Sequence, residues 1–160
     1  YEVDKHLADL WSKGILLELF VKRVLEKKIP DLRIEHGPVV ISFPAVNPES
    51  SAQTEYGKLS GWHEVDLAFS LRNKLTLVEC KNSAPFPIES GQQYNDITHF
   101  LGVTADIERY YSIESRKVFI QTSELHEQLY SFKGRNSFTL CTKDDLVSNL
   151  KTLLEQLLSA

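Results

Sequence analysis

The spacing of apolar residues changes along the first third of the chain. Between residues 6 and 28 they recur every three or four positions, which predicts a long amphipathic helix that ends before Pro30. Residues 32–46 are rich in β-branched side chains and predict a strand, in which Gly37 and Pro38 mark either a bend or a late start. Residues 44–61 are mostly polar and predict a connection longer than those usual in compact domains.

The next segment has the pattern of a β-hairpin. Over 62–71 apolar and polar residues alternate, as they do in a strand with one buried face. Arg72 and Asn73 interrupt this pattern, and a second apolar run follows over 75–81. Two such runs joined by a two-residue polar connection predict antiparallel strands with a tight turn.

The second half of the chain alternates helices and strands. Ser90 and Gln93 form a capping box that opens a helix, which we expect to end at Gly102, with a helical extension over 106–113. The other predicted elements are a strand over 117–121, a helix over 123–132, a strand over 137–141, and a helix over 146–158 opened by a capping box of Thr142 and Asp145. This order predicts an α/β protein with a central mixed β-sheet flanked by helices.

Composition narrows the class of protein. A chain of 160 residues with 42% hydrophobic and 25% charged residues fits one globular domain with its own core. It contains no methionine, even at position 1, so we expect residues 1–160 to be a single domain of a longer protein. We expect an intracellular, cytoplasmic setting that keeps Cys80 and Cys141 reduced, and no association with membranes.

Charged residues interrupt the apolar pattern in both strands of the hairpin. Glu64 and Asp66 share one face of the first strand, and Glu79 and Lys81 share one face of the second. Counting outward from the turn places Asp66 within about one residue pair of Glu79. Charged side chains on strands that are otherwise apolar need a physical reason, because an unpaired buried charge is costly.

These residues have the chemistry needed to hydrolyse a phosphodiester bond. Two carboxylates and a backbone carbonyl are hard oxygen ligands suited to Mg²⁺, which keeps several waters. A neighbouring lysine polarises or deprotonates a water, and the metal lowers the pKa of that water and neutralises charge on the phosphate. The pattern therefore predicts a metal site made by Asp66 and Glu79, with Lys81 beside it.

This arrangement resembles the PD-(D/E)XK nuclease superfamily, which includes restriction endonucleases, Holliday-junction resolvases and nuclease domains of some CRISPR ancillary effectors. The resemblance is carried by Glu64-Val65-Asp66, by Glu79-Cys80-Lys81 and by the hairpin between them. It implies a restriction-endonuclease-like core of order αβββαβ over roughly the first three quarters of the chain, here extended by a C-terminal αβα. Asp66 lacks the preceding proline of the family motif, which departs from the pattern.

The resemblance also implies the roles of individual residues. Asp66, Glu79 and the backbone carbonyl of Cys80 would hold Mg²⁺ or Mn²⁺, and Lys81 would position or activate the attacking water. Many members place a further carboxylate on the first helix, for which Glu18 is the candidate, and some place a glutamine on the helix after the second motif, for which Gln93 or Gln92 is the candidate. The implied activity is hydrolysis of DNA, or of RNA, leaving 5′-phosphate and 3′-hydroxyl ends.

Other interpretations of Glu18 and Gln93 remain open. Glu18 lies four residues before Lys22 and would form a surface ion pair with it. Gly14, one turn earlier, would instead let the helix approach the sheet and carry Glu18 over the strand ends. Gln93 would serve the helix cap, and the Cys80 side chain would face away into packing. The five histidines, His36 among them, have no partner spacing.

The partner and the activity also have alternatives. A net charge of −4 argues against nucleic-acid binding by bulk charge, although a local basic cleft remains compatible with it. Lys13, Lys58 and Arg109 are the candidate phosphate contacts, a thin set that favours a homodimer or a fused recognition or sensor domain. The chain would then be the effector domain of a defence protein. The alternative function is an inactive nuclease-like fold that binds nucleic acid or protein.

Overall fold

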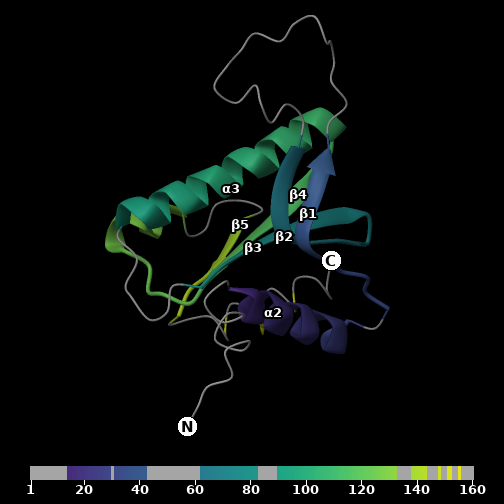
Figure 1. Ribbon diagram of the computed structural model, residues 1–160, viewed down its shortest axis with the longest axis horizontal. Helices are drawn as coiled ribbons and strands as arrows, with labels where there is room; N and C mark the ends of the chain where they lie inside the picture. Colours follow the sequence, from purple (N-terminus) through teal and green to yellow (C-terminus); the bar gives the residue numbers. More distant parts are fainter. Residues whose placement is uncertain are drawn as a thin grey trace, which may run out of the picture.

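A computed structural model describes residues 14–29, 31–42, 62–82, 90–132 and 138–143, together with four later positions. Its elements, with the labels of Figure 1, are α2 (Ile15–Lys28), β1 (Glu35–Ser42), β2 (Trp62–Leu71), β3 (Lys74–Lys81), α3 (Ser90–Tyr111), β4 (Ser115–Gln121), the 3-10 helix η1 (Glu127–Phe132) and β5 (Phe138–Cys141). The later positions Ser148, Lys151, Thr152 and Glu155 are helical.

The strands form one mixed sheet in the order β1-β2-β3-β4-β5. The first three strands are antiparallel, whereas β3, β4 and β5 run parallel. A parallel neighbour needs a crossover connection, and α3 supplies it between β3 and β4. The sequence prediction of an α/β protein with a central mixed sheet is therefore confirmed.

The two long helices cover opposite faces of the sheet (Figure 1). On one face Val21 and Leu25 of α2 pack against strand residues that include Leu67 and Val78. On the other face the core is formed by α3, η1 and the alternate strand positions, such as Leu77 and Phe119. The strands are buried on both faces, so most of their residues are apolar and a charged residue in them stands out.

The predicted hairpin is present with the predicted turn. Arg72 and Asn73 both have positive φ, 52° and 60°, as a two-residue turn between twisted antiparallel strands requires. Leu71 pairs with Lys74 next to this turn, and the pairing continues to Leu67 and Val78. This register sets which charged residues of β2 and β3 face one another.

Two predicted helices differ from the observed ones. Helix α3 does not end at Gly102 but runs to Tyr111, because Val103 and Ile107 continue its buried stripe and their packing outweighs the helix penalty of about 1 kcal/mol for a glycine. The helix expected over 123–132 is a 3-10 helix that begins at Glu127. The residues before it, Ser123, Glu124 and His126, bind the side chain of Gln93 and are not helical.

Several predictions lie outside the described residues. They concern the start of the first helix, including Lys13, the long connection that contains Lys58, and the Asp145 half of the second capping box. Within the described part of the chain, no helix combines the length and the apolar character that crossing a bilayer requires.

Candidate active site

Strands β2 and β3 stop pairing at the level of Asp66. Their last paired residues are Leu67 and Val78, so Asp66 and Glu79 are the next residues along the two strands. Instead of a strand carbonyl, the Asp66 carboxylate accepts the hydrogen bond from the Cys80 backbone N–H, with Oδ2 2.6 Å from the nitrogen. The Asp66 carboxylate thus lies at the point where the backbone hydrogen bonds between β2 and β3 end.

The ladder is also irregular on the other side of Asp66. Between β1 and β2 the register shifts, so that His36 pairs with Leu67 and Val39 pairs with Val65. Gly37 and the proline after it therefore lie opposite Asp66 alone, which is the arrangement of a β-bulge. Asp66 is flanked by irregular backbone on both sides, which frees its side chain from the alternation of a regular strand.

Glu79 and Lys81 lie together on the α3 face of the sheet. Their side chains form an ion pair, with Lys81 Nζ 2.5 Å from Glu79 Oε1. Glu79 is largely buried, and Lys81 is 37% exposed. The Cys80 side chain between them packs in the core on the α2 face. It therefore points away from this pair, as the alternation of the strand predicts.

Helix α2 carries Glu18 into the same region. Its N-terminal residue Gly14 has φ +77°, and a Cβ built there would lie 3.6 Å from Asn82 Cβ at the end of β3. This is an ordinary van der Waals distance, so the start of α2 lies beside the end of β3, and the positive φ rather than a lack of space favours glycine here. Glu18 is buried, with Oε2 3.2 Å from His36 Nε2, and Lys22 is 3.8 Å from Glu26 rather than paired with Glu18.

The carboxylates influence one another across the gap between the strands. Burial, and then the charge of Asp66, raise the pKa of Glu18 to about 7. The same two causes raise the pKa of Glu79 to about 7. Burial also raises the pKa of Asp66. A raised pKa means that the ionised form of each of these three acids is disfavoured. A bound cation would stabilise the ionised forms, because it offsets both their desolvation and their mutual repulsion.

The positive charge of Lys81 acts on all three of these groups. Burial lowers the pKa of Lys81, but Glu79 and then Asp66 outweigh that effect, and the pKa of Lys81 lies above its ordinary value. Lys81 therefore carries a full positive charge at neutral pH in this arrangement. It is suited to orient a water or to face a phosphate oxygen as an ammonium ion.

The donor set fits a magnesium ion that keeps most of its waters. Within the described residues, no three His, Cys, Asp or Glu side chains are grouped as a ready-made metal site. The predicted ligands are the carboxylates of Asp66 and Glu79 and the backbone carbonyl of Cys80, with Glu18 contacting the metal or its waters. These are oxygen ligands, and Mg²⁺ binds commonly through one or two carboxylates.

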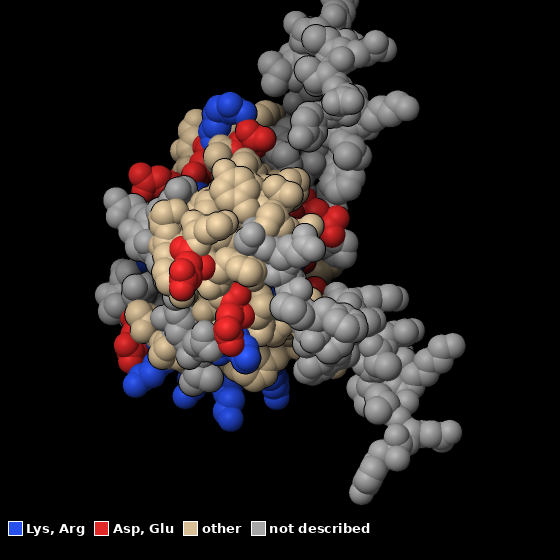
Figure 2. All heavy atoms as spheres, turned by 90° about the vertical axis from the view of Figure 1, so that its left-hand side faces the viewer, with Lys and Arg blue, Asp and Glu red and all other residues tan. Residues whose placement is uncertain are grey.

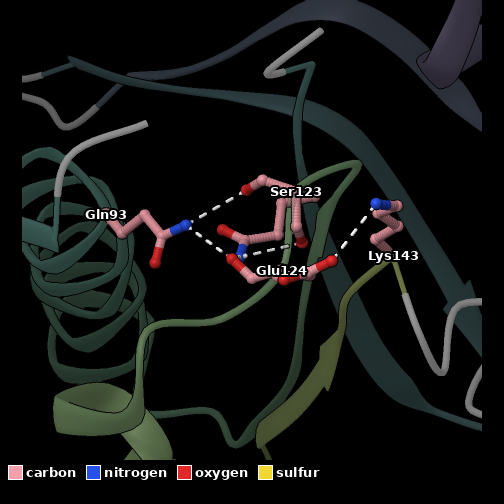
Figure 3. Close-up of polar contacts among 5 residues, drawn as sticks. Gln93, Ser123, Glu124 and Lys143 are labelled. Atoms are coloured by element: carbon pink, nitrogen blue, oxygen red, sulfur yellow. Dashed lines mark hydrogen bonds and ion pairs between the residues drawn. The ribbon is translucent and has the colours of Figure 1, made fainter. Parts of the chain in front are cut away.

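Gln93 has a different environment from the acidic residues (Figure 3). Its Nε2 donates to Ser123 Oγ at 3.1 Å and to the Glu124 carbonyl at 2.8 Å, and its Oε1 accepts from the His126 backbone N–H. Both donor hydrogens are used, and the side chain is buried. In this conformation Gln93 joins α3 to the segment after β4. Gln92 donates to Asp96 instead.

Two residues that the sequence did not single out belong to this region. His36 contacts Glu18. The negative charge of Asp96, on α3, contributes to raising the pKa of both Glu79 and Lys81. The sequence does indicate the position of His36 indirectly. Gly37 and Pro38 follow it, and a glycine and a proline inside a strand indicate a bulge that can redirect a neighbouring side chain. Asp96 lies beside a predicted apolar helix stripe and gives no comparable signal.

The pKa of Glu18 leads to a prediction about stability. Its folded-state value of about 7 lies above the ordinary 4.5, so the folded, metal-free protein loses stability as pH rises from about 4.5 to about 7. We expect Glu18→Gln to remove this loss and to stabilise the metal-free protein at pH 8 by roughly 2 kcal/mol, with little gain at pH 4. Urea unfolding in EDTA measures the difference. Glu26→Gln on the same helix is the control, and equal gains at both pH values would contradict the prediction.

Comparisons with known proteins identify the fold alone. No protein-family model and no curated protein matches the chain. Protein VC1899 from Vibrio cholerae has a similar structure, with a TM-score of 0.65 and 14% identity over 97% of this chain and 36% of that one. A protein of unknown function, AF1548, is similar with a TM-score of 0.53 and 13% identity over 84% of this chain and 62% of its own. The chain thus spans about a third of VC1899.

Proposed function

We propose that this chain is a metal-dependent nuclease with a restriction-endonuclease-like core. The observation that carries the proposal is that Asp66 binds the Cys80 N–H where β2 and β3 stop pairing, and that its charge acts on the ion pair of Glu79 and Lys81. The order of helices and strands up to β4 is the αβββαβ order expected of that core. Glu18, buried and electrostatically linked to Asp66, adds the carboxylate expected from the first helix.

Each residue has a role in the proposed reaction. Asp66, Glu79 and the Cys80 carbonyl would hold Mg²⁺ or Mn²⁺, with Glu18 contacting its waters. A metal held there would lower the pKa of a coordinated water and neutralise charge that develops on the phosphate. Lys81 orients the attacking water with its ammonium group and places a positive charge beside the scissile phosphate. Hydrolysis then leaves 5′-phosphate and 3′-hydroxyl ends.

The proposed substrate is DNA, with RNA as the second candidate. The distribution of charge supports a polyanionic substrate despite the net charge of −4. Lys and Arg side chains gather along the lower edge of Figure 2, the side on which α2 lies in Figure 1. Helix α2 contributes the exposed Arg23, Lys27 and Lys28. We propose that a second copy, or a recognition or sensor domain joined to this one, supplies further phosphate contacts.

A cleavage assay tests the proposal. The purified chain is incubated with linear, circular, single-stranded and branched DNA and with RNA, in Mg²⁺, in Mn²⁺ or in EDTA. We expect cleavage with either metal, none in EDTA, and products whose 5′ ends carry phosphate. Calorimetry with Mn²⁺ distinguishes the alternatives. Metal binding without cleavage of any substrate, or no metal binding, would favour an inactive nuclease-like fold.

A further inference from the structure

The bulge in β1 brings a histidine to the acidic residues. His36 pairs with Leu67 in the ladder, and the register shift begins immediately after it. Leu67 belongs to the core on the α2 face, and paired residues share a face, so His36 lies on the side of the sheet that α2 covers. Its Nε2 lies 3.2 Å from Glu18 Oε2.

Gly37, the next residue of the bulge, lies near the same oxygen of Glu18. A Cβ built on Gly37 would lie 3.5 Å from Glu18 Oε2, and the residue has φ +41°, a conformation that side chains other than glycine rarely adopt. The same carboxylate oxygen therefore has the His36 imidazole and the Gly37 backbone beside it. Two consecutive residues of β1 thus lie beside the end of the Glu18 side chain.

The imidazole nitrogen is available for this role. His36 Nε2 is buried and forms no well-aligned hydrogen bond with any described residue, although Glu18 Oε2 is within contact distance. Buried nitrogens usually have a partner, and contacts in active sites often align only when the ligand is bound. The Glu18 carboxylate lies 3.2 Å from this nitrogen, and Asp66 is also close enough for the His36 charge to affect it.

We propose that His36 is a positioning residue that fixes the Glu18 carboxylate toward Asp66 and the waters of the metal. This inference rests on the proposed nuclease function. Glutamate has several rotatable bonds, so a fixed partner restricts it to the conformation that the metal site uses. Residues that hold a metal-binding carboxylate in this way affect metal affinity without contacting the metal.

A metal titration of the full 160-residue chain, without nucleic acid, tests the inference. The electron paramagnetic resonance signal of free Mn²⁺ gives the half-saturating concentration for the wild type, His36→Leu, His36→Gln and the control His99→Ala, an exposed histidine of α3. We expect His36→Leu to raise that concentration by about 10–100-fold. His36→Gln, whose amide can donate a hydrogen bond, should recover most of the affinity, and His99→Ala should match the wild type.

A double-mutant cycle shows whether His36 acts through Glu18. In a Glu18→Gln background, His36→Leu should cause little further loss of Mn²⁺ affinity. An undiminished loss in that background would overturn the positioning role, because His36 would then act on the metal independently. Cleavage at saturating Mn²⁺ should stay within a few-fold of the wild type for His36→Leu. His36→Ala replaces His36→Leu if the leucine variant does not fold.

The outcomes separate this inference from the proposed function. If the wild type binds Mn²⁺ and cleaves nucleic acid while His36→Leu leaves the half-saturating concentration within two-fold, only the inference fails. If the wild type does not bind Mn²⁺, the proposed function fails and the inference fails with it.

Discussion

Replacing Asp66 by asparagine is expected to reduce metal-dependent cleavage by about 10³-fold or more, because a metal contributes several kcal/mol of transition-state stabilisation. Asparagine keeps an oxygen that accepts the hydrogen bond from the Cys80 N–H, whereas alanine would leave this N–H unpaired. The variant thus removes the charge and retains the backbone contact. Initial cleavage rates at fixed Mg²⁺ and the Mn²⁺ dissociation constant from calorimetry measure the effect.

The matched control for this variant is Asp106→Asn. Asp106 is paired with Arg109 on the exposed side of α3, so the substitution changes the net charge equally but far along the helix from the acidic residues. We expect its cleavage rate to equal that of the wild type. Circular dichroism and a urea midpoint confirm that both variants are folded. Cleavage by Asp66→Asn within ten-fold of the wild type would contradict the assignment of Asp66 as a metal ligand.

The part of the site on the hairpin could be predicted from the sequence because it depends on local geometry. A two-residue turn at Arg72 and Asn73 fixes the register of the two antiparallel strands. Counting outward from the turn in this register brings Asp66 level with Glu79. Alternation then places Lys81 beside Glu79 and turns the Cys80 side chain to the opposite face. None of these steps needs a contact between distant segments of the chain.

The contacts of Glu18 could be predicted only in part. Gly14, just before α2, lies beside the end of β3, but its positive φ accounts for the glycine, because a Cβ there would be at an ordinary contact distance. The contact with His36 depends on a bulge in another strand and on how α2 lies across the sheet, and neither follows from spacing along the chain. The two segments meet only through tertiary packing.

Tertiary packing also explains the elements that differ from the predictions. The residues after β4 have helical propensity, but the buried amide of Gln93 binds their backbone groups and holds them in a loop. A side-chain amide that satisfies backbone groups competes with a helix for the same hydrogen bonds. The sequence indicated that Gln93 was polar at a helix start, but its partners lie 30 or more residues further along the chain.

Lys81→Met is expected to lower cleavage by about 10²–10³-fold, the range for loss of a single group that stabilises charge in the transition state. Methionine fills a similar volume without a charge. We expect Mn²⁺ to bind at least as tightly as in the wild type, because the substitution removes a cation that lies 2.5 Å from Glu79 and competes with the metal for its carboxylate. Single-turnover rates and Mn²⁺ calorimetry measure the two effects.

Substrate binding distinguishes a role of Lys81 in the chemical step from a role in holding the phosphate backbone. Its control is Lys143→Met, which removes an equally charged residue from an exposed pair with Glu124. Nucleic-acid affinity, measured with Ca²⁺ in place of Mg²⁺, should be similar for the two variants, whereas the cleavage rate should fall only for Lys81→Met. If Lys81→Met instead loses affinity in proportion to its loss of rate, Lys81 is a phosphate contact, because its removal then weakens the ground state and the transition state equally.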